Sequence, residues 1–430
     1  YRRQRQMCIR DRKKRVIGVL SFIAIVLVAL LVHNNYYASK KVITNTDRAV
    51  FNTDGMLTMM YEVTTGSGEY EVTTDTTWPQ EGYIFNATMS RCENGSTLYW
   101  NDETKTVMLE ANVSDKCYIY FDKALTLAEY ITTQVYTGTD GDNGLYYHDG
   151  SGSYINADQE AGDNSYRYSG ANPNNYVCFG SDEATCPVDN LYRIIGVFGD
   201  QVKLIKSDII TEDYIGYANY TYDSSRWGNG YNGIYEVVSY YYWDGRQSDS
   251  WSTTGASWTN SSLNTVTLNQ TYLNKFSSEW QQLISNHNWQ VGGGTFDNIA
   301  ENIPKVSYSY ELGNNSLSMV YNAKIGLMYV SDYAYAASPD YWNLSLYSYY
   351  GAASENWLYI GTSELLIPNR TNVSTYYHFV VYGDEDWNGD PNGYIGTNRG
   401  GVVRTTFYLN ENVLMTFGDG TKDNPYRISL

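Results

Sequence analysis

The feature that most constrains this chain is a run of seventeen uncharged residues, 16–32, directly after Lys13-Lys14-Arg15. As a helix, a run of this length is at the lower limit of what spans the hydrocarbon core of a bilayer. A helix in the core of a globular protein usually keeps a polar face, which this run lacks. Because basic residues stay on the cytoplasmic side, we expect a transmembrane helix with everything from about Ala38 outside.

Two alternatives to an uncleaved signal anchor are a buried core helix and a cleaved secretory peptide. Residues 36–40, Tyr-Tyr-Ala-Ser-Lys, are a poor cleavage site. Residues 1–12 are predicted to be a sequencing artefact, because Met7 to Arg12 looks like the translated end of a transposon used in sequencing libraries. The sequence therefore predicts a cytoplasmic stub and anchor over 13–37, in a bacterial cell membrane whose lipid bilayer is a partner, with a single pass and the C-terminal ectodomain outside.

Composition adds two constraints. The formal net charge is −18, which repels nucleic acid and excludes a role that depends on phosphate binding. Tyrosine is unusually abundant, with 45 residues. Tyrosine-rich sequences are typical of β-rich extracellular modules, where the ring packs and the hydroxyl stays hydrated, and also of recognition surfaces.

Four of the five cysteines follow the apolar run and form two local couples, Cys92 with Cys117 and Cys178 with Cys186. In an oxidising compartment this arrangement predicts two disulfides. A metal site would need closer C-x-x-C spacing with histidines nearby, although other pairings of the cysteines stay open.

The chain divides into three regions after the anchor. Residues 38–123 alternate in the manner of short strands separated by turn signals, which predicts a membrane-proximal, small all-β module. Residues 124–164 are predicted to be a helix and linker, and the helix starts with a capping box at Thr126 and Glu129. The alternative to a linker is a long irregular loop that packs over the next domain. Residues 165–430 are predicted to form an α+β ectodomain.

Three segments define the secondary structure of that ectodomain. Residues 193–198 and 201–206 predict a hairpin with a two-residue turn, in which Val197 faces Val202 and Ile195 faces Leu204. Apolar residues at helical spacing predict one continuous helix over 268–284. Residues 327–330 predict a strand that leads into a short helix capped at Ser331-Asp332 and ending at Ala337.

Five motifs together resemble a known but uncharacterised family: Ser165–Gly170, Asn190–Gly196, Asp332–Ala337, Asn356–Leu358, and Val403-Arg404 before Phe407–Leu409. The family is a domain of surface proteins of gut Firmicutes, distantly similar to the formylglycine-generating-enzyme and C-type-lectin-like folds. The resemblance covers about residues 165–430 and implies a C-type-lectin-like α+β fold, with no known activity. Thr405 stands where family members usually carry proline, so the local geometry is not transferred.

Catalytic motifs are missing from the sequence. The three histidines after the predicted anchor over 13–37, which are His148, His287 and His378, belong to no nucleophile or metal motif, and no phosphate-binding glycine loop occurs. Paired carboxylates could still act on a polymer, but nothing in the sequence selects a pair. We therefore name no catalytic residue.

An acidic stretch is the best candidate for a metal site. Asp384, Asp386, Asn388 and Asp390 offer oxygen ligands around a glycine-containing turn, as calcium requires. A complete EF-hand loop would carry glutamate where this chain has Ile395. The alternative is a solvated acidic turn, so calcium is the one cofactor that the sequence suggests.

Aromatic residues in the last third suggest a ligand site for glycans. Trp387, Tyr382, Tyr394 and Trp357 could stack on sugar rings beside Asp and Asn partners. Core packing is the favoured interpretation of Trp357.

These observations predict a membrane-anchored extracellular protein for recognition or adhesion, with a glycan or surface-protein ligand and no nucleic acid. The alternatives are an extracellular polymer-acting hydrolase or modifying enzyme, and a structural envelope component.

Overall fold

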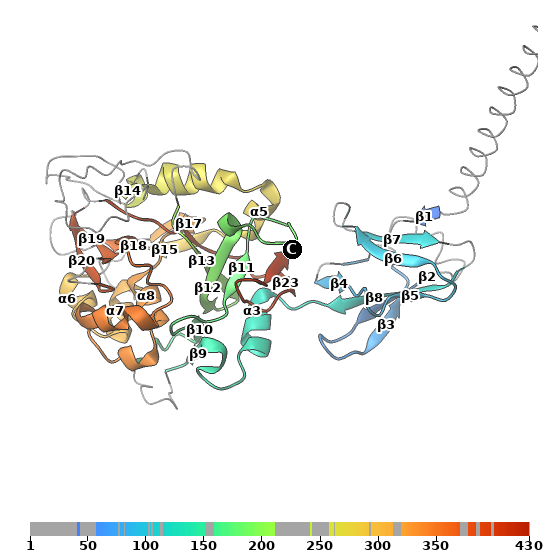
Figure 1. The fold of residues 1–430 in the computed structure, drawn as a ribbon, viewed down its shortest axis with the longest axis horizontal. Coiled ribbons are helices and arrows are strands. Elements are labelled where there is room, and N and C mark those ends of the chain that lie inside the picture. Colours follow the sequence, from blue (N-terminus) through green and yellow to red (C-terminus); the bar gives the residue numbers. More distant parts are fainter. Residues whose placement is uncertain are drawn as a thin grey trace, which may run out of the picture. The chain divides into compact units, whose positions relative to one another are not determined.

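The computed structural model describes the chain from residue 41 onward in several stretches, which Figure 1 draws as a coloured ribbon. The described residues are 41–43, 57–75, 78–80, 82–101, 104, 106–111, 115–150, 159–210, 241–242, 258–261, 263–291, 294–312, 320–369, 377–383, 388–396 and 400–429.

The predicted fold class needs correction at its first element. Within the ranges just given, no helix is both long and apolar enough to span a membrane. The described chain instead has mixed α and β content in several sheets. The predicted anchor at 16–32 and the predicted artefact at 1–12 lie outside the described residues.

The chain forms two compact units, which divide between Ala124 and Leu125. In the N-terminal unit, β1, β7 and β6 form one sheet. A second sheet has the order β3-β2-β8-β4, with β5 also paired to β8. The strands are β1 (Lys41–Ile43), β2 (Leu57–Glu62), β3 (Tyr70–Thr73), β4 (Tyr83–Phe85), β5 (Arg91–Cys92), β6 (Thr97–Asn101), β7 (Thr106–Ala111) and β8 (Cys117–Lys123).

The two sheets share one small core. Alternate residues of β8 point the same way, which buries Cys117, Ile119 and Phe121 to 2% exposure or less. Leu57 and Met59 of β2 join them, as do Trp78, Val107 and Leu109. The first predicted disulfide is confirmed: Cys92 and Cys117 face each other on β5 and β8 with their Cα atoms 4.0 Å apart.

The larger unit is built on a sheet with the order β17-β22-β13-β12-β10-β9, and β11 also pairs with β12. The strands of this unit are β9 (Leu145–His148), β10 (Ser165–Tyr168), β11 (Tyr176–Cys178), β12 (Leu191–Phe198), β13 (Gln201–Lys206), β14 (Tyr241–Tyr242), β15 (His287–Gln290), β16 (Val320–Ala323), β17 (Ile325–Gly326), β18 (Glu364–Asn369), β19 (Tyr377–Val381), β20 (Pro391–Gly396), β21 (Gly400–Gly401), β22 (Thr406–Tyr408), β23 (Leu414–Phe417) and β24 (Arg427–Ser429).

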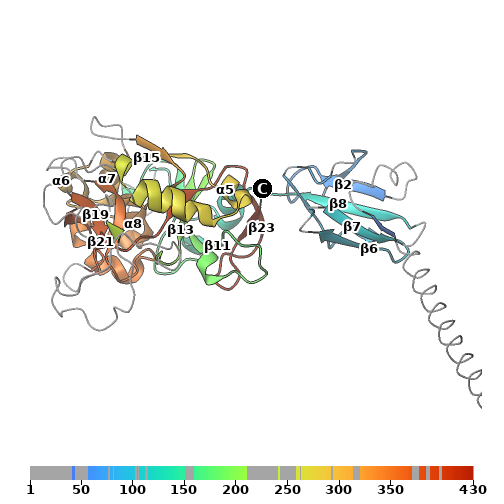
Figure 2. The ribbon, with the colours of Figure 1, turned by 90° about the horizontal axis from the view of Figure 1, so that it is seen from above.

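Helical segments pack around this sheet. Figure 1 shows α6, α7 and α8 gathered near β18, β19 and β20. Figures 1 and 2 show the longer helical segment η7, in yellow, lying along the sheet close to β13. The segments are α3 (Leu127–Tyr130), η2 (Ile131–Val135), η3 (Asp142–Gly144), η5 (Val188–Asn190), η6 (Trp258–Asn260), η7 (Leu263–Tyr272), η8 (Leu273–Lys275), α5 (Ser278–Leu283), α6 (Phe296–Ile299), α7 (Pro304–Glu311), α8 (Val330–Ala336), η9 (Pro339–Tyr341) and η10 (Leu346–Glu355).

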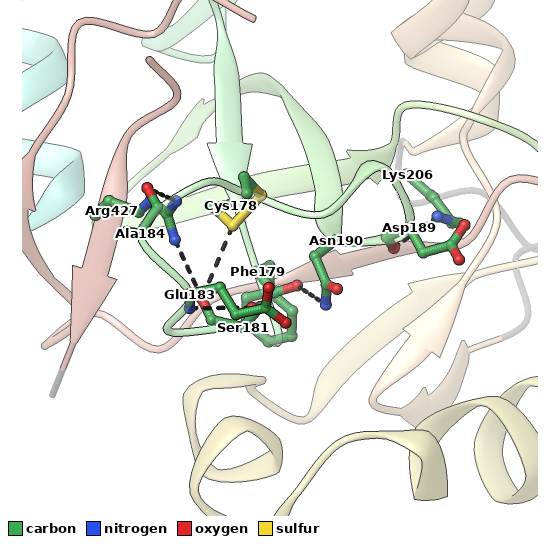
Figure 3. Close-up of a disulfide and its surroundings, with 10 residues drawn as sticks. Cys178, Phe179, Ser181, Glu183, Ala184, Asp189, Asn190, Lys206 and Arg427 are labelled. Atoms are coloured by element: carbon green, nitrogen blue, oxygen red, sulfur yellow. Dashed lines mark hydrogen bonds between the residues drawn. A yellow bond between two sulfur atoms is a disulfide. The ribbon is translucent and has the colours of Figure 1, made fainter. Parts of the chain in front are cut away.

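The second predicted disulfide is also confirmed. Cys178 at the end of β11 is bonded to Cys186 across a short loop. Arg427 of β24 donates from Nη1 to the carbonyl of Ser181 at 3.3 Å and from Nη2 to that of Ala184 at 3.1 Å (Figure 3). The bridge and these bonds fix the loop against the C-terminal strand.

The central hairpin has the predicted strands but a different register. Val197 pairs with Val202 as expected, whereas Leu204 lies opposite Ile194 and not Ile195. A β-bulge between Ile194 and Gly196 adds one residue to β12 and causes the shift. At Gly196 a Cβ atom would lie 2.3 Å from the carbonyl oxygen of Tyr166 on β10. The close approach of β10 therefore requires glycine at the bulge.

The region 124–164 starts as predicted but belongs to the larger unit. Thr126 and Glu129 form the capping box, in which each side chain accepts from the other residue's backbone N–H. Leu127 and Ile131 are completely buried in the core of the larger unit, and β9 pairs with β10. Part of this region is thus a packed element of the domain.

The predicted helix over 268–284 is interrupted. Its apolar stripe is buried at Leu268, Tyr272 and Phe276, but the backbone becomes extended at Phe276. Asn269 shows why the turns before the break are irregular: its side-chain amide donates to the carbonyls of Asn264 and Ile325. Side-chain amides compete with the regular helical ladder, and here they also attach the segment to β17.

The strand predicted over 327–330 is wrong, because these residues lead directly into α8. Tyr329 is the N-cap in place of the predicted Ser331-Asp332, and the helix ends at Ala336. Asp332 lies one turn inside the helix, where its Oδ2 accepts from the N–H of Tyr329 at 2.7 Å. The acidic side chain is therefore a cap that reaches back to the helix start.

Candidate functional site

The residues that carry the family resemblance lie inside the larger unit. The guanidinium of Arg193 lies between two rings, 4.4 Å from the centre of Trp357 and 4.5 Å from that of Tyr176. The indole Nε1 of Trp357 donates to the carbonyl of Tyr168 at 2.8 Å, and this tryptophan is 5% exposed. Trp357 thus packs in the core and binds a buried cation with its face.

A second buried arginine, Arg404, forms a bidentate ion pair with Glu364 of β18. Nε donates to Oε1 at 2.8 Å and Nη2 to Oε2 at 2.7 Å, while Nη2 also reaches the carbonyl of Leu358 at 2.6 Å. Burial raises the pKa of Glu364, and the adjacent guanidinium opposes that rise. The pair ties β18 to the chain just before β22.

A third, Arg167 of β10, combines both kinds of partner. Its Nη2 donates to Asp163 at 2.6 Å and its Nε to Ser165 at 2.8 Å. Its guanidinium also lies 4.7 Å from the ring centre of Phe198 and 5.0 Å from that of Tyr335. Burial by itself would raise the pKa of Asp163, but the charge of Arg167 lowers it well below its ordinary value.

The start of α8 brings two carboxylates close together. Asp332 accepts from Lys203 Nζ at 2.5 Å. Glu311 accepts from the backbone N–H groups of residues 330 and 331 at 2.7 and 2.9 Å. Burial raises the pKa of Glu311 to about 7. A carboxyl group with a raised pKa beside a second carboxylate is a pattern expected of a hydrolase, but Asp332 and Glu311 are only 3% and 1% exposed, so a polymer could not reach them.

The three histidines named from the sequence also pack in the interior of the larger unit. His148 and His378 are completely buried, and burial lowers the pKa of His148 well below its ordinary value and that of His378 to about 3. His287 stacks on Tyr408 with ring centres 3.7 Å apart. Burial, with a smaller contribution from Lys203, lowers the pKa of His287 to about 4. None of these histidines is set up as an accessible general base.

The predicted calcium site is only partly described. Asp384 and Asp386 lie outside the described residues, whereas Asn388 is exposed and Asp390 is buried. Gly389, with φ of +87°, makes the turn. The amide oxygen of Asn388 accepts a hydrogen bond from the hydroxyl of Tyr359, which occupies one of the predicted metal ligands.

Of the four aromatic residues predicted to bind a glycan, the structure describes the side chains of two. Trp387 and the side chain of Tyr394 lie outside the described residues. Tyr382 is half-buried against the core, and its backbone N–H donates to the carbonyl of Asp390 at 3.0 Å. Since Trp357 is in the core, Tyr382 is the one partly accessible ring among those predicted residues whose side chains are described.

In the described part of the chain, one group of side chains has the spacing of metal ligands, namely Cys92, Asp115 and Cys117. Both cysteines are consumed by their disulfide. Asp115 accepts from the backbone N–H groups of Asn94 and Ser96 at 2.7 and 2.9 Å. This group therefore stabilises a turn and offers no thiolate to a metal.

Sequence reasoning missed an exposed aromatic surface next to η10. Leu346, Tyr349 and Ala352 of this segment are buried at a spacing of three residues, and the backbone is non-helical at Ser348, so that η10 consists of two short helical pieces. This is the period of a 3₁₀ helix, and it leaves Tyr347 and Tyr350 on the solvent side, 41% and 67% exposed. Leu344, just before the helix, is 39% exposed. We call Leu344, Tyr347 and Tyr350 the η10 face.

The η10 face has a rigid support. The backbone N–H of Leu346 donates to the carbonyl of Asn302 at 3.0 Å, and that of Tyr347 to the carbonyl of Ala300 at 2.7 Å. The ring of Tyr347 packs edge-on against Phe296 of α6. Once a 3₁₀ helix is assumed, the spacing of three between Leu346, Tyr349 and Ala352 explains which residues are buried. No signal in the sequence indicates a 3₁₀ helix at this place.

Comparisons with protein-family models, with curated proteins and with solved structures give no match to this chain. The family resemblance and the fold that it implies therefore stay predictions.

Proposed function

We propose that this protein is an extracellular recognition protein that binds an uncharged carbohydrate through the η10 face. The observation that carries the proposal is the pair of exposed tyrosines on either side of the kink at Ser348, in a segment whose first turn is hydrogen-bonded to residues 300 and 302. Tyrosine rings stack on the apolar faces of sugars, and their hydroxyls hydrogen-bond to them. A rigid aromatic surface loses little conformational entropy on binding.

Polar neighbours support a sugar ligand in particular. Asn343 and Ser348, which are close to the two tyrosines in the sequence, are exposed and offer an amide and a hydroxyl to sugar hydroxyl groups. The formal net charge of −18 opposes the approach of anionic polymers and favours a neutral ligand.

The two disulfides support the extracellular location, because such bridges persist in oxidising compartments. A polymer-acting enzyme is less well supported, since Glu311 and Asp332, the two carboxylates that meet at the start of α8, are buried. The buried arginines and their rings account for the family motifs as parts of a scaffold.

The test is binding of the purified full chain to a broad array of neutral glycans. We expect specific binding that falls at least tenfold in the double variant Tyr347→Ala/Tyr350→Ala. The matched control is Tyr99→Ala in β6 of the N-terminal unit, where the tyrosine is also 41% exposed and the change should leave binding unaltered. An array with no specific signal, or a double variant that binds like the wild type, would refute the proposal.

A further inference from the structure

A lysine and an aspartate form a short, buried ion pair in the interior of the larger unit. Lys203 Nζ on β13 lies 2.5 Å from Asp332 Oδ2 on α8. Lys203 has no measurable exposure and Asp332 is 3% exposed. A buried ion pair of this kind loses most of its hydration, and the Coulomb attraction only partly compensates for that loss.

The surroundings of the amine are aromatic. Four rings lie around Lys203 Nζ, with centres at 4.2 Å for Tyr329, 5.1 Å for Tyr408, 5.5 Å for Trp289 and 5.7 Å for Phe198. Such a site excludes water and has a low local dielectric constant, which favours the neutral amine over the ammonium. Burial accordingly lowers the pKa of Lys203, although the charge of Asp332 opposes this.

A third buried group, Glu311, stands next to the pair. Asp332 accepts from the backbone N–H of residue 329, and Glu311 accepts from those of residues 330 and 331, so the two carboxyl groups bind consecutive amides. The charge of Asp332 adds to the burial that raises the pKa of Glu311 to about 7. Near neutral pH this carboxyl group can therefore both give and take a proton.

From this arrangement we infer that Lys203 and Asp332 condense to an intramolecular isopeptide bond, with Glu311 transferring the proton. Proton transfer within the ion pair gives a neutral amine and a neutral carboxylic acid. The amine lone pair attacks Cγ of Asp332, so that an N–Cγ bond forms and a Cγ–O bond breaks. Glu311 takes a proton from the nitrogen and returns it to the departing oxygen, which leaves as water.

The reaction is balanced without an oxidant, a reductant or a cofactor, because an amine and an acid give one amide and one water. Condensation is unfavourable between separate molecules in water. Groups held together in a fold reach effective concentrations of about 10⁵ M or more, which can reverse that balance. The fold supplies the position, the aromatic shell keeps bulk water out, and Glu311 supplies the proton path.

Other buried cations in the described structure do not share this chemistry. Arg404 and Arg167 face carboxylates, but a guanidinium stays protonated and is a poor nucleophile. Lys206, also on β13 and 1% exposed, donates from Nζ to the backbone carbonyl of Asp189 at 2.8 Å. The variant Lys206→Met removes a second buried amine of β13 and leaves Lys203 and Asp332 in place, which makes it a matched control.

The experiment is a mass measurement on the full chain after denaturation and reduction of the disulfides. We expect a mass lower than that of the sequence by one water, and a peptide map in which the peptide with Lys203 is joined to the peptide with Asp332. Recovery of Lys203 and Asp332 in separate, unmodified peptides from the folded wild-type protein would show a plain ion pair and overturn the inference.

Three variants locate the bond and its proton carrier. Lys206→Met should leave the linked peptide unchanged, and Glu311→Gln should reduce its yield at least tenfold, since an amide cannot carry the proton. Lys203→Met should abolish the link. If this variant does not fold, the wild-type map and Glu311→Gln still decide the matter. A Glu311→Gln protein linked as fully as the wild type would disprove the role of Glu311.

Discussion

At the scale of single residues, several charged side chains of the larger unit are buried and have their partners within the same unit. Arg193 contacts two rings, Arg404 pairs with Glu364, and Lys203 pairs with Asp332 inside an aromatic shell. Removing one member of such a pair leaves a buried charge without compensation, so these residues act together. The tyrosine-rich composition supplies the rings that make so many buried cations tolerable.

Buried histidines predict how stability depends on pH. His378 has a pKa of about 3 in the folded chain, against an ordinary value of 6.5. Between these values the unfolded chain binds a proton that the folded chain does not, so stability is fully present above about pH 6.5 and falls as the pH decreases. The expected slope is about 1.4 kcal/mol per pH unit for this residue.

Chemical denaturation at several pH values between 7.5 and 4.5 measures that slope, with His378→Gln as the test variant. Glu311 acts in the opposite sense, because its raised pKa removes stability as the pH rises from about 4.5 through 7. The comparison must therefore be between variant and wild type. A His378→Gln protein with the same slope as the wild type would contradict this prediction.

At the scale of elements, each deviation from the predicted pattern can be traced to a particular contact. Apolar spacing identified the buried stripe through Leu268, Tyr272 and Phe276, but it could not reveal that Asn269 diverts the helical ladder toward β17. Alternation identified the central hairpin, but an added residue in β12 changes the register beyond Gly196. Both deviations depend on contacts with strands that are distant in sequence.

The bulge predicts a sharp response at Gly196. A methyl group there would lie 2.3 Å from the carbonyl oxygen of Tyr166, so β10 and β12 would have to separate. We expect Gly196→Ala to lower the free energy of unfolding by about 3 kcal/mol, at the upper end of overpacking effects. Gly351→Ala is the control, since its Cβ would meet only an ordinary contact at 3.6 Å. Urea denaturation measures both, and equal stabilities would argue against a bulge at this position.

At the scale of the whole molecule, local sequence signals predicted more than long-range ones. The cysteine couples and the capping box at Thr126 were confirmed, because each depends on residues close in sequence. The candidate site was predicted poorly. Trp357 is held in the core by Arg193, a residue far away in sequence, and the exposure of Tyr347 and Tyr350 depends on a 3₁₀ period that composition does not signal.

The separate cores of the two units predict separate unfolding. One core contains the Cys92–Cys117 bridge, whereas Cys178–Cys186 closes a loop of the larger unit. We expect Cys92→Ser/Cys117→Ser to destabilise only the N-terminal unit, by about 3 kcal/mol for a loop of this length.

Differential scanning calorimetry of the full chain should show two transitions, of which this double variant lowers one and leaves the other in place. Cys178→Ser/Cys186→Ser should act on the other transition, with a smaller effect because its loop is shorter. If either variant shifts both transitions together, the two units unfold as one cooperative body, and the division of the chain at Ala124 has no thermodynamic meaning.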